Sequence, residues 1–307
     1  MGRFSKDPGK SRIIGGVNSV LKRKNAIGYL FCAPQFLLIV LFMAYPIING
    51  IFLGFHEWDG LGAKEFIAFE NYKDMLHDRT FWIALKNTFV YALISMAGNV
   101  ALGLLLALSV SRRKGVNFYR VVFYLPVLLS GTAVALMWSR IYEPTAGLLN
   151  SLMSLVGLES LTTAWLGNPD TAMGATLVVA IWKHCGFPMI LFITAILSIP
   201  KEVYEASELD GASRLQENFY ITLPMIRNVF LTVLTLQLIN SMKAFDTIWV
   251  MTAGGPGTTT TVLTLEIYLE AFRHSNYGYA SALSTVLIAI IVFIKFGLNK
   301  ITAKYED

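Results

Sequence analysis

Long apolar runs separated by short polar segments dominate the pattern of this 307-residue chain. A helix that crosses the hydrocarbon core of a bilayer needs about 20 mostly apolar residues. Prolines inside such runs do not exclude helices, because neighbouring helices can satisfy the carbonyl groups that a proline frees. The pattern predicts an all-α polytopic membrane protein. Its six transmembrane helices are expected near residues 27–51, 83–110, 119–141, 172–199, 225–251 and 276–299.

The predicted spans form one transmembrane domain over residues 26–299, between an N-terminal tail of residues 1–25 and a C-terminal tail of residues 300–307. The first apolar run follows the basic cluster Lys22-Arg23-Lys24, as the core of a signal peptide does. It is longer than the 7–15 apolar residues of a typical signal peptide, and no small-residue cleavage site closes it. We therefore expect a retained span.

Composition agrees with a membrane protein, because 55% of the residues are hydrophobic and only 15% are charged. Soluble domains carry about 25% charged residues. The distribution of the basic residues behind the net charge of +5 indicates how the chain is oriented in the membrane. If the N-terminus lies inside, most lysines and arginines fall on the inner loops, which is the positive-inside bias of membrane proteins. The bias predicts that both termini lie in the cytoplasm.

One inner loop departs from this rule. The segment from Pro200 to Pro224, here called the acidic loop, joins the fourth and fifth predicted spans. It balances only Lys201 and Arg214 against five acids, which are Glu202, Glu205, Glu208, Asp210 and Glu217. An acidic segment on the positive side of a membrane protein calls for an explanation.

The acidic loop carries signals for two short helices. Pro200 suits the first position of a helix, where its missing N–H costs nothing. Gly211 can end that helix in a left-handed conformation. Ser213 with Gln216 three residues later is typical of a capping box at the start of a second helix. The predicted shape is helix, glycine turn, helix and then membrane.

Two interpretations of the first helix remain open on its residues alone. Its apolar positions Val203, Ala206 and Leu209 alternate with acids, which fits a docking surface for a protein partner. The same pattern fits a solvated amphipathic helix that lies on the membrane surface.

The acidic loop resembles the EAA loop of permease subunits of bacterial ABC importers. That family pattern is Glu-Ala-Ala, three residues, Gly, a spacer and Ile-x-Leu-Pro. This chain has Glu205-Ala206-Ser207, Asp210-Gly211-Ala212, Ile221 and Leu223-Pro224. It departs from the pattern at Ser207, which replaces the second Ala, and at Asn228, where many relatives have Pro.

The resemblance extends over roughly residues 25–300, to permeases of the maltose and glycerol-3-phosphate type. The segments that carry it are Asn87-Thr88, residues 118–126, residues 147–150, Phe245-Asp246, residues 252–256 and residues 277–284.

The resemblance implies the architecture of a type I ABC importer permease in a bacterial cytoplasmic membrane. It implies three kinds of partner: a second homologous permease, two ATPase subunits and an extracytoplasmic solute-binding protein. The expected substrate is a di- or oligosaccharide, with glycerol-3-phosphate as the alternative. The resemblance also places six residues at the contact with the ATPase, namely Glu205, Ala206, Ser207, Asp210, Gly211 and Ala212.

Signatures of enzymatic chemistry are missing from the sequence. There is no Gly-x-x-x-x-Gly-Lys-Ser/Thr phosphate loop, and the glycine-rich stretch Gly254–Gly257 lacks the lysine. The four histidines are scattered, which does not favour a metal site or a catalytic base. We expect a transport subunit that is not an enzyme and has no cofactor, with ATP bound by the partner ATPases.

Polar residues within apolar spans are expensive and are functional candidates by default. Two clusters qualify, one in the fourth span and one in the fifth, and both could line a sugar pathway. A structural alternative is that Lys183 or Lys243 pairs with Asp246 or with the partner permease. The candidate pathway residues are Trp182, Lys183, His184, Gln237, Asn240, Lys243 and Asp246.

An ion-coupled secondary transporter is the rival interpretation. It would explain Lys183 and Asp246 as a coupling pair. It leaves the acidic loop unexplained, and the sequence lacks the paired broken spans that inverted repeats produce.

Overall fold

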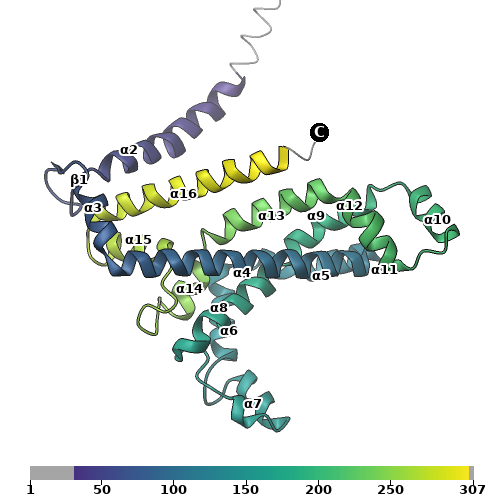
Figure 1. Cartoon of the computed structure of the whole chain (residues 1–307). Coiled ribbons are helices and arrows are strands. Elements are labelled where there is room, and N and C mark those ends of the chain that lie inside the picture. The colour runs from purple at the N-terminus through teal and green to yellow at the C-terminus, as the bar shows by residue number, and fades with distance from the viewer. Residues whose placement is uncertain (1–30, 304–307) are drawn as a thin grey trace, which may run out of the picture. The chain divides into compact units, whose positions relative to one another are not determined.

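The computed structural model describes residues 31–303 of the chain (Figure 1). The predicted tail of residues 1–25 lies outside the described residues, as do residues 304–307 of the C-terminal tail. The chain divides into two units, Met1–Leu53 and Gly54–Asp307.

The described part of the first unit is a helix of 23 residues, Phe31–Leu53, long and apolar enough to cross a membrane. It contains a π-helical turn η1 (Val40–Ala44) followed by α2 (Tyr45–Leu53). Pro46 cannot donate a helical hydrogen bond, and the π turn directly precedes it. The predicted first span therefore coincides with this helix from residue 31 onward, and the helix extends to Leu53, whereas residues 27–30 lie outside the described residues.

The second unit is mainly helical, with one two-stranded antiparallel sheet among its described residues, β1 (His56–Glu57) with β2 (Glu65–Phe66). Its helices are α3 (Glu70–His77), α4 (Arg79–Val110), α5 (Val116–Leu128), α6 (Gly131–Ile141), α7 (Leu148–Leu155), η2 (Glu159–Leu161), α8 (Pro169–His184), α9 (Gly186–Leu197), α10 (Lys201–Leu209), α11 (Arg214–Glu217), η3 (Asn218–Thr222), α12 (Leu223–Met225), α13 (Arg227–Ser241), α14 (Asp246–Met251), α15 (Leu263–Phe272) and α16 (Tyr277–Ala303).

Helix α4 is the central element of this unit (Figure 1). It has 32 residues, and the side chain of its N-cap residue Asp78 accepts a hydrogen bond from the backbone N–H of Thr80 at 2.8 Å. It packs against α9 and α13. Gly103 permits the contact with α9, because a Cβ there would lie 2.7 Å from the Cβ of Pro188. Close approach at small residues is the usual way in which helices pack in lipid.

Three of the predicted spans in this unit coincide with helices that are long and apolar enough to cross a membrane. Helices α4 and α16 cover the second and the sixth as continuous helices. The fourth corresponds to α8 and α9, which together form a helix of 29 residues from Pro169 to Leu197. Its hydrogen-bond pattern is interrupted at Cys185. The interruption is expected because Pro188 cannot donate a bond to the carbonyl group of His184.

The third predicted span is not one continuous helix. Helices α5 and α6 meet at an angle of 91°. Leu129 and Ser130 between them have extended ψ angles of 146° and 135°. The turn lets α6 pack against α14 and α8. Hydropathy alone gives no sign of it, because both arms of the bend are apolar.

The fifth predicted span, residues 225–251, is also wrong as a single helix. A 73° bend separates Arg214–Met225 from α13, and α13 ends at Ser241. Residues 242–245 form a turn, after which α14 starts at Asp246. The turn is stable because the hydroxyl of Thr264 donates a hydrogen bond to the freed carbonyl of Ala244.

Helix α15 and the loop before it were not among the predicted elements. The side-chain amide of Asn87 in α4 donates to the carbonyl groups of Thr258, Thr259 and Thr261 at 3.2, 3.1 and 2.9 Å. The hydroxyl of Thr88 accepts from the backbone N–H of Leu263 at 2.8 Å. The Asn-Thr pair therefore fixes this loop to α4.

We predict that Gly186→Ala destabilises the protein. A Cβ at this position would lie 2.1 Å from the carbonyl oxygen of Phe123, so α9 and α5 would have to separate. Overpacking of this kind costs about 1–3 kcal/mol. The thermal unfolding midpoint of the purified protein in detergent measures this loss of stability. The matched control is Gly174→Ala in α8, where a Cβ would meet nothing within 4 Å. Equal midpoints for the two variants would contradict the packing assignment.

Candidate functional site

The acidic loop has the predicted shape of helix, glycine turn and helix. The first helix, α10, begins at Lys201, with Pro200 as its N-cap rather than as its first helical residue. Gly211 has φ of +78°, and its N–H bonds to the carbonyl of Glu208 at 3.1 Å. The next N–H, of Ala212, bonds to the carbonyl of Ser207 at 3.0 Å. These two bonds form a Schellman motif, which glycine suits because it lacks a Cβ.

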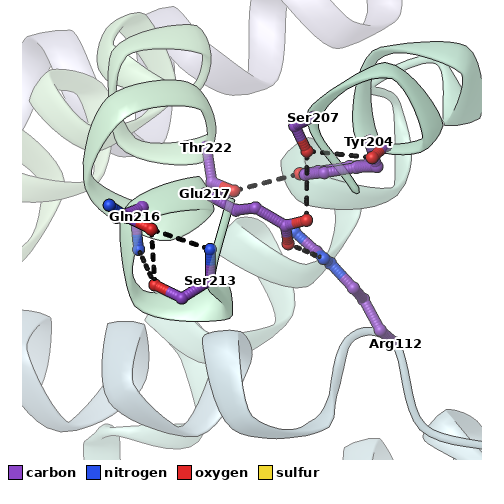
Figure 2. A network of polar contacts seen from close by, with 7 residues as sticks. All are labelled: Arg112, Tyr204, Ser207, Ser213, Gln216, Glu217 and Thr222. Carbon is purple, nitrogen blue, oxygen red and sulfur yellow. Dashed lines mark hydrogen bonds and ion pairs between the residues drawn. The ribbon is translucent and has the colours of Figure 1, made fainter. Parts of the chain in front are cut away.

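The second helix of the loop, α11, starts with the predicted capping box. The hydroxyl of Ser213 accepts from the N–H of Gln216 at 3.4 Å, and the Gln216 side chain accepts from the N–H of Ser213 at 2.8 Å. Ser213 and Gln216 therefore fix the direction of the chain after the glycine turn (Figure 2).

Most predicted contact residues of the acidic loop are on its surface. Glu205, Ala206, Asp210 and Gly211 are exposed, and Ala212 is half-buried. Two large apolar side chains lie close to them in sequence, Leu209 with 89% and Leu215 with 70% of its surface exposed. Apolar side chains that stay exposed among acids fit a docking surface for a protein.

Ser207 is the exception among the predicted contact residues, because the structure buries it. Its hydroxyl lies 2.9 Å from the carbonyl of Tyr204 and 3.0 Å from Oε1 of Glu217 (Figure 2). The second Glu217 oxygen pairs with the guanidinium of Arg112, which follows α4. The Ser207 hydroxyl, which replaces the methyl group of the second Ala in the EAA pattern, therefore faces inward. Ser207 does not belong to the exposed contact surface.

Sequence reasoning did not identify Arg112 or Glu217 as functional candidates. Glu217 is only 1% exposed, and the two residues are 105 positions apart. A buried carboxylate that loses its cation costs about 3–5 kcal/mol. No local spacing signals such a pair, because the fold alone brings the end of α4 to α11.

A cavity of about 400 Å³ is the second candidate site. It lies among α4, α5, α6, α8, α9, α13 and α14. Its lining residues are Tyr91, Ser95, Asn99, Val127, Gly131, Ala180, Lys183, His184, Phe187, Gln237, Asn240, Ser241, Lys243, Ala244, Phe245, Asp246 and Thr247.

The cavity brings together six of the seven predicted pathway residues, from both predicted clusters. Trp182 is not among the lining residues, and its ring contacts Trp138 edge-on, with 5.6 Å between the ring centroids. Lys243 and Asp246 were expected on a continuous helix. They lie instead at the turn between α13 and α14, where the chain bends around the cavity.

Polar residues of α4 that sequence reasoning missed complete the cavity wall. Asn99 donates to the hydroxyl of Ser95 at 3.2 Å, and Ser241 donates to the same hydroxyl at 3.4 Å. The side-chain oxygen of Asn99 is buried without a hydrogen-bond partner. Ser95 and Asn99 are polar residues four apart in an apolar span, so the rule that selected the other candidates could have found them.

The charged groups of the cavity do not pair with one another. Neither Lys183 nor Lys243 forms an ion pair with Asp246 in the described chain. The Asp246 carboxylate lies against the start of α6 instead, where a Cβ on Gly131 would be 2.9 Å from its Oδ2. The positive end of a helix dipole favours a carboxylate at such a position. The coupling pair that a secondary transporter would need is therefore not formed.

Comparison with known proteins agrees with this geometry. The family model for the inner membrane component of binding-protein-dependent transport systems matches residues 99–303. The probable ABC transporter permease protein YurN of Bacillus subtilis is 38% identical, and the match covers 88% of this chain and 94% of YurN. The multiple sugar-binding transport system permease protein MsmF of Streptococcus mutans is 33% identical, over 91% of this chain and 96% of MsmF.

A solved structure shares the fold. It is a chain of a bacterial ABC transporter involved in the import of the acidic polysaccharide alginate, with a TM-score of 0.81 and 24% identity. The match covers 92% of this chain and 96% of that chain. The helices of the second unit, with their bent pairs, therefore have the architecture of a type I ABC importer permease.

The family model covers more than half of the chain, and the relatives match over nearly their whole length. This chain belongs to the family of binding-protein-dependent transport system inner membrane components, and it is a membrane-embedded permease subunit of an ABC transporter.

Proposed function

We propose that this permease imports a di- or oligosaccharide through the cavity described above. The observation that carries the proposal is the uncharged part of the cavity wall. Gln237, Asn240 and Asn99 line the cavity and carry amide groups, which can donate to and accept from sugar hydroxyls. Phe245 and Tyr91 add aromatic surface on which the apolar face of a sugar can lie. Ligand sites typically combine such apolar surface with a few placed polar groups.

The named functions of the relatives support a carbohydrate. MsmF is named for a multiple sugar-binding system, and the structural neighbour belongs to an alginate importer. Glycerol-3-phosphate is the second candidate, since Lys183 and Lys243 line the cavity without an acidic partner. The carbohydrate is favoured because MsmF and the structural neighbour are named for sugars and a polysaccharide.

The partners in this proposal are a second homologous permease, two ATPase subunits and an extracytoplasmic binding protein. A structure of the alginate transporter with its saccharide-bound periplasmic protein supports the last of these. The ATPases would bind ATP, and this chain would bind no cofactor. The exposed face of α10, with Glu205, Ala206 and Asp210, would seat in an ATPase groove that offers basic and apolar surface.

The proposed orientation has both termini in the cytoplasm of a bacterial cell. The acidic loop and the segment after α4, with Arg112, Arg113 and Lys114, lie at the same end of the second unit. The positive-inside rule assigns that end to the cytoplasm, where the ATPases are. ATP binding would draw the two loops of the permease pair together and open the cavity outward. ATP hydrolysis would return the cavity to a state that is open to the cytoplasm.

Charge reversal at the exposed face tests the docking part of the proposal. Glu205→Lys should abolish retention of the ATPase subunit when the tagged permease is purified in detergent, because like charges across a protein interface repel. The matched control is Glu159→Lys, an exposed acid in η2. Retention of the ATPase by Glu205→Lys at the level of the control would rule out this docking face.

Substitutions in the cavity test the substrate part. Gln237→Ala and Asn240→Ala should each lower saccharide uptake about 2- to 10-fold, which is what a lost neutral hydrogen bond of about 0.5–1.5 kcal/mol predicts. Uptake of labelled di- and oligosaccharides by cells measures this. Thr232→Ala on the same helix is the control, because the Thr232 hydroxyl bonds only to its own helix, at the carbonyl of Asn228. Normal uptake of every saccharide by both cavity variants would contradict the assignment.

A further inference from the structure

We infer that Arg112 and Glu217 form a latch that makes α4 move together with the acidic loop. The latch is defined here as Arg112, Glu217, Ser207 and Tyr204. The inference rests on the proposed function, because it assigns a step in the transfer of force from the ATPase to the cavity. It concerns positioning residues, since none of the four lines the cavity.

The latch contains a long-range ion pair. A second ion pair, between Glu270 and His274, joins residues a single helical turn apart. Arg112–Glu217 instead connects segments separated by 105 positions. It joins the end of α4 to the second helix of the acidic loop.

Arg112 contacts both helices of the loop at once. Its guanidinium pairs with Glu217 of α11 and lies 3.7 Å from the centroid of the Tyr204 ring of α10. Ser207 of α10 donates to the other oxygen of Glu217 at 3.0 Å. Tyr204 in turn bonds to Thr222 at 3.1 Å (Figure 2). The arrangement holds α10, α11 and the end of α4 in one geometry.

The covalent chain alone does not connect α4 to a movement of the acidic loop. The acidic loop continues directly into α9 on one side and into α13 on the other, so a displacement of the loop reaches both helices through the chain. Helix α4 has no such connection to the loop. It nevertheless supplies Tyr91, Ser95 and Asn99 to the cavity wall opposite Gln237 and Asn240 of α13.

Packing against α9 and α13 couples α4 to the loop indirectly. The latch adds a direct connection between the end of α4 and the loop itself. Asn99 is 13 positions before Arg112, which is about 20 Å along a helix. Since α4 is unbroken from Asn99 to Val110, two residues before Arg112, a displacement at Arg112 is carried to Asn99. A hydrogen-bonded ion pair to a buried carboxylate suits this task because it is directional and short.

The test is the number of ATP molecules hydrolysed per saccharide imported by the complete transporter in proteoliposomes. The probe is the labelled saccharide that the wild-type transporter imports. In Glu217→Gln the side chain keeps its size and loses its charge. We expect ATP hydrolysis to continue and the ratio of ATP to saccharide to rise about five- to tenfold, the scale of a coupling free energy of 1–1.4 kcal/mol. An unchanged ratio would overturn the inference, including the case in which both rates fall in proportion.

Further variants separate the latch from a general loss of structure. Arg112→Gln should raise the ratio as Glu217→Gln does, and the double variant should be no worse than Arg112→Gln, because the two residues act as a pair. Ser207→Ala removes one bond to the carboxylate and keeps the ion pair, so its effect should be smaller but present. It is the variant to measure if Glu217→Gln does not assemble. The controls Arg113→Gln and Glu159→Gln change exposed charges outside the latch and outside the docking helix, and both should keep the wild-type ratio.

A second readout needs neither ATP nor saccharide. Spin labels at Ser109 of α4 and Glu208 of α10, both exposed, report the distance between the two helices in the purified complex with the native cysteines replaced. We expect one narrow distance distribution with Glu217 and a broad one with Glu217→Gln. Equal widths would overturn the latch. Failure of the wild-type complex to import any saccharide would instead count against the proposed function, and the width comparison would still decide the latch.

Discussion

The need to satisfy backbone hydrogen bonds inside a bilayer is the constraint on which this structure depends. Helices meet it internally, and a break is tolerated only where protein groups or a cavity receive the freed carbonyl and N–H groups. Three of the breaks described in the second unit lie between α5 and α6, at Cys185 between α8 and α9, and between α13 and α14. All three adjoin the same cavity, which Gly131, His184 and Ala244 help to line. The irregular backbone and the polar cavity are thus two aspects of one site.

Long unbroken helices surround this irregular centre. Helix α4 passes the cavity on one side and continues to the acidic loop, where Arg112 meets Glu217. Close packing at Gly103 against α9 keeps it straight and near its neighbour. An unbroken helix transmits a displacement along its length, whereas a broken helix can bend at the break. In this fold α4 would therefore carry the displacement, and the broken helices around the cavity would change shape as it opens.

The sequence predicted much of this arrangement, for physical reasons that apply locally. Hydropathy located the spans that are continuous, and the glycine turn and capping box of the acidic loop follow from Gly211, Ser213 and Gln216, which act within a few residues. The polar residues of α8 and α13 were found because polar groups are rare in lipid. The bends at Ser130 and at residues 242–245 were not predictable, because tertiary contacts with α14 and with Thr264 stabilise them. The burial of Ser207 was missed for the same reason, since its partner Glu217 follows a turn whose angle the sequence does not give.

The central claim is that ATP hydrolysed by ATPase subunits docked at the acidic loop drives import through this chain. The most direct measurement uses proteoliposomes with the complete transporter, the binding protein and labelled saccharide outside, and ATP sealed inside. The account predicts accumulation of the saccharide against its gradient that requires internal ATP and persists when a protonophore and a sodium ionophore collapse the ion gradients. Accumulation without ATP that disappears with the ion gradients would contradict it.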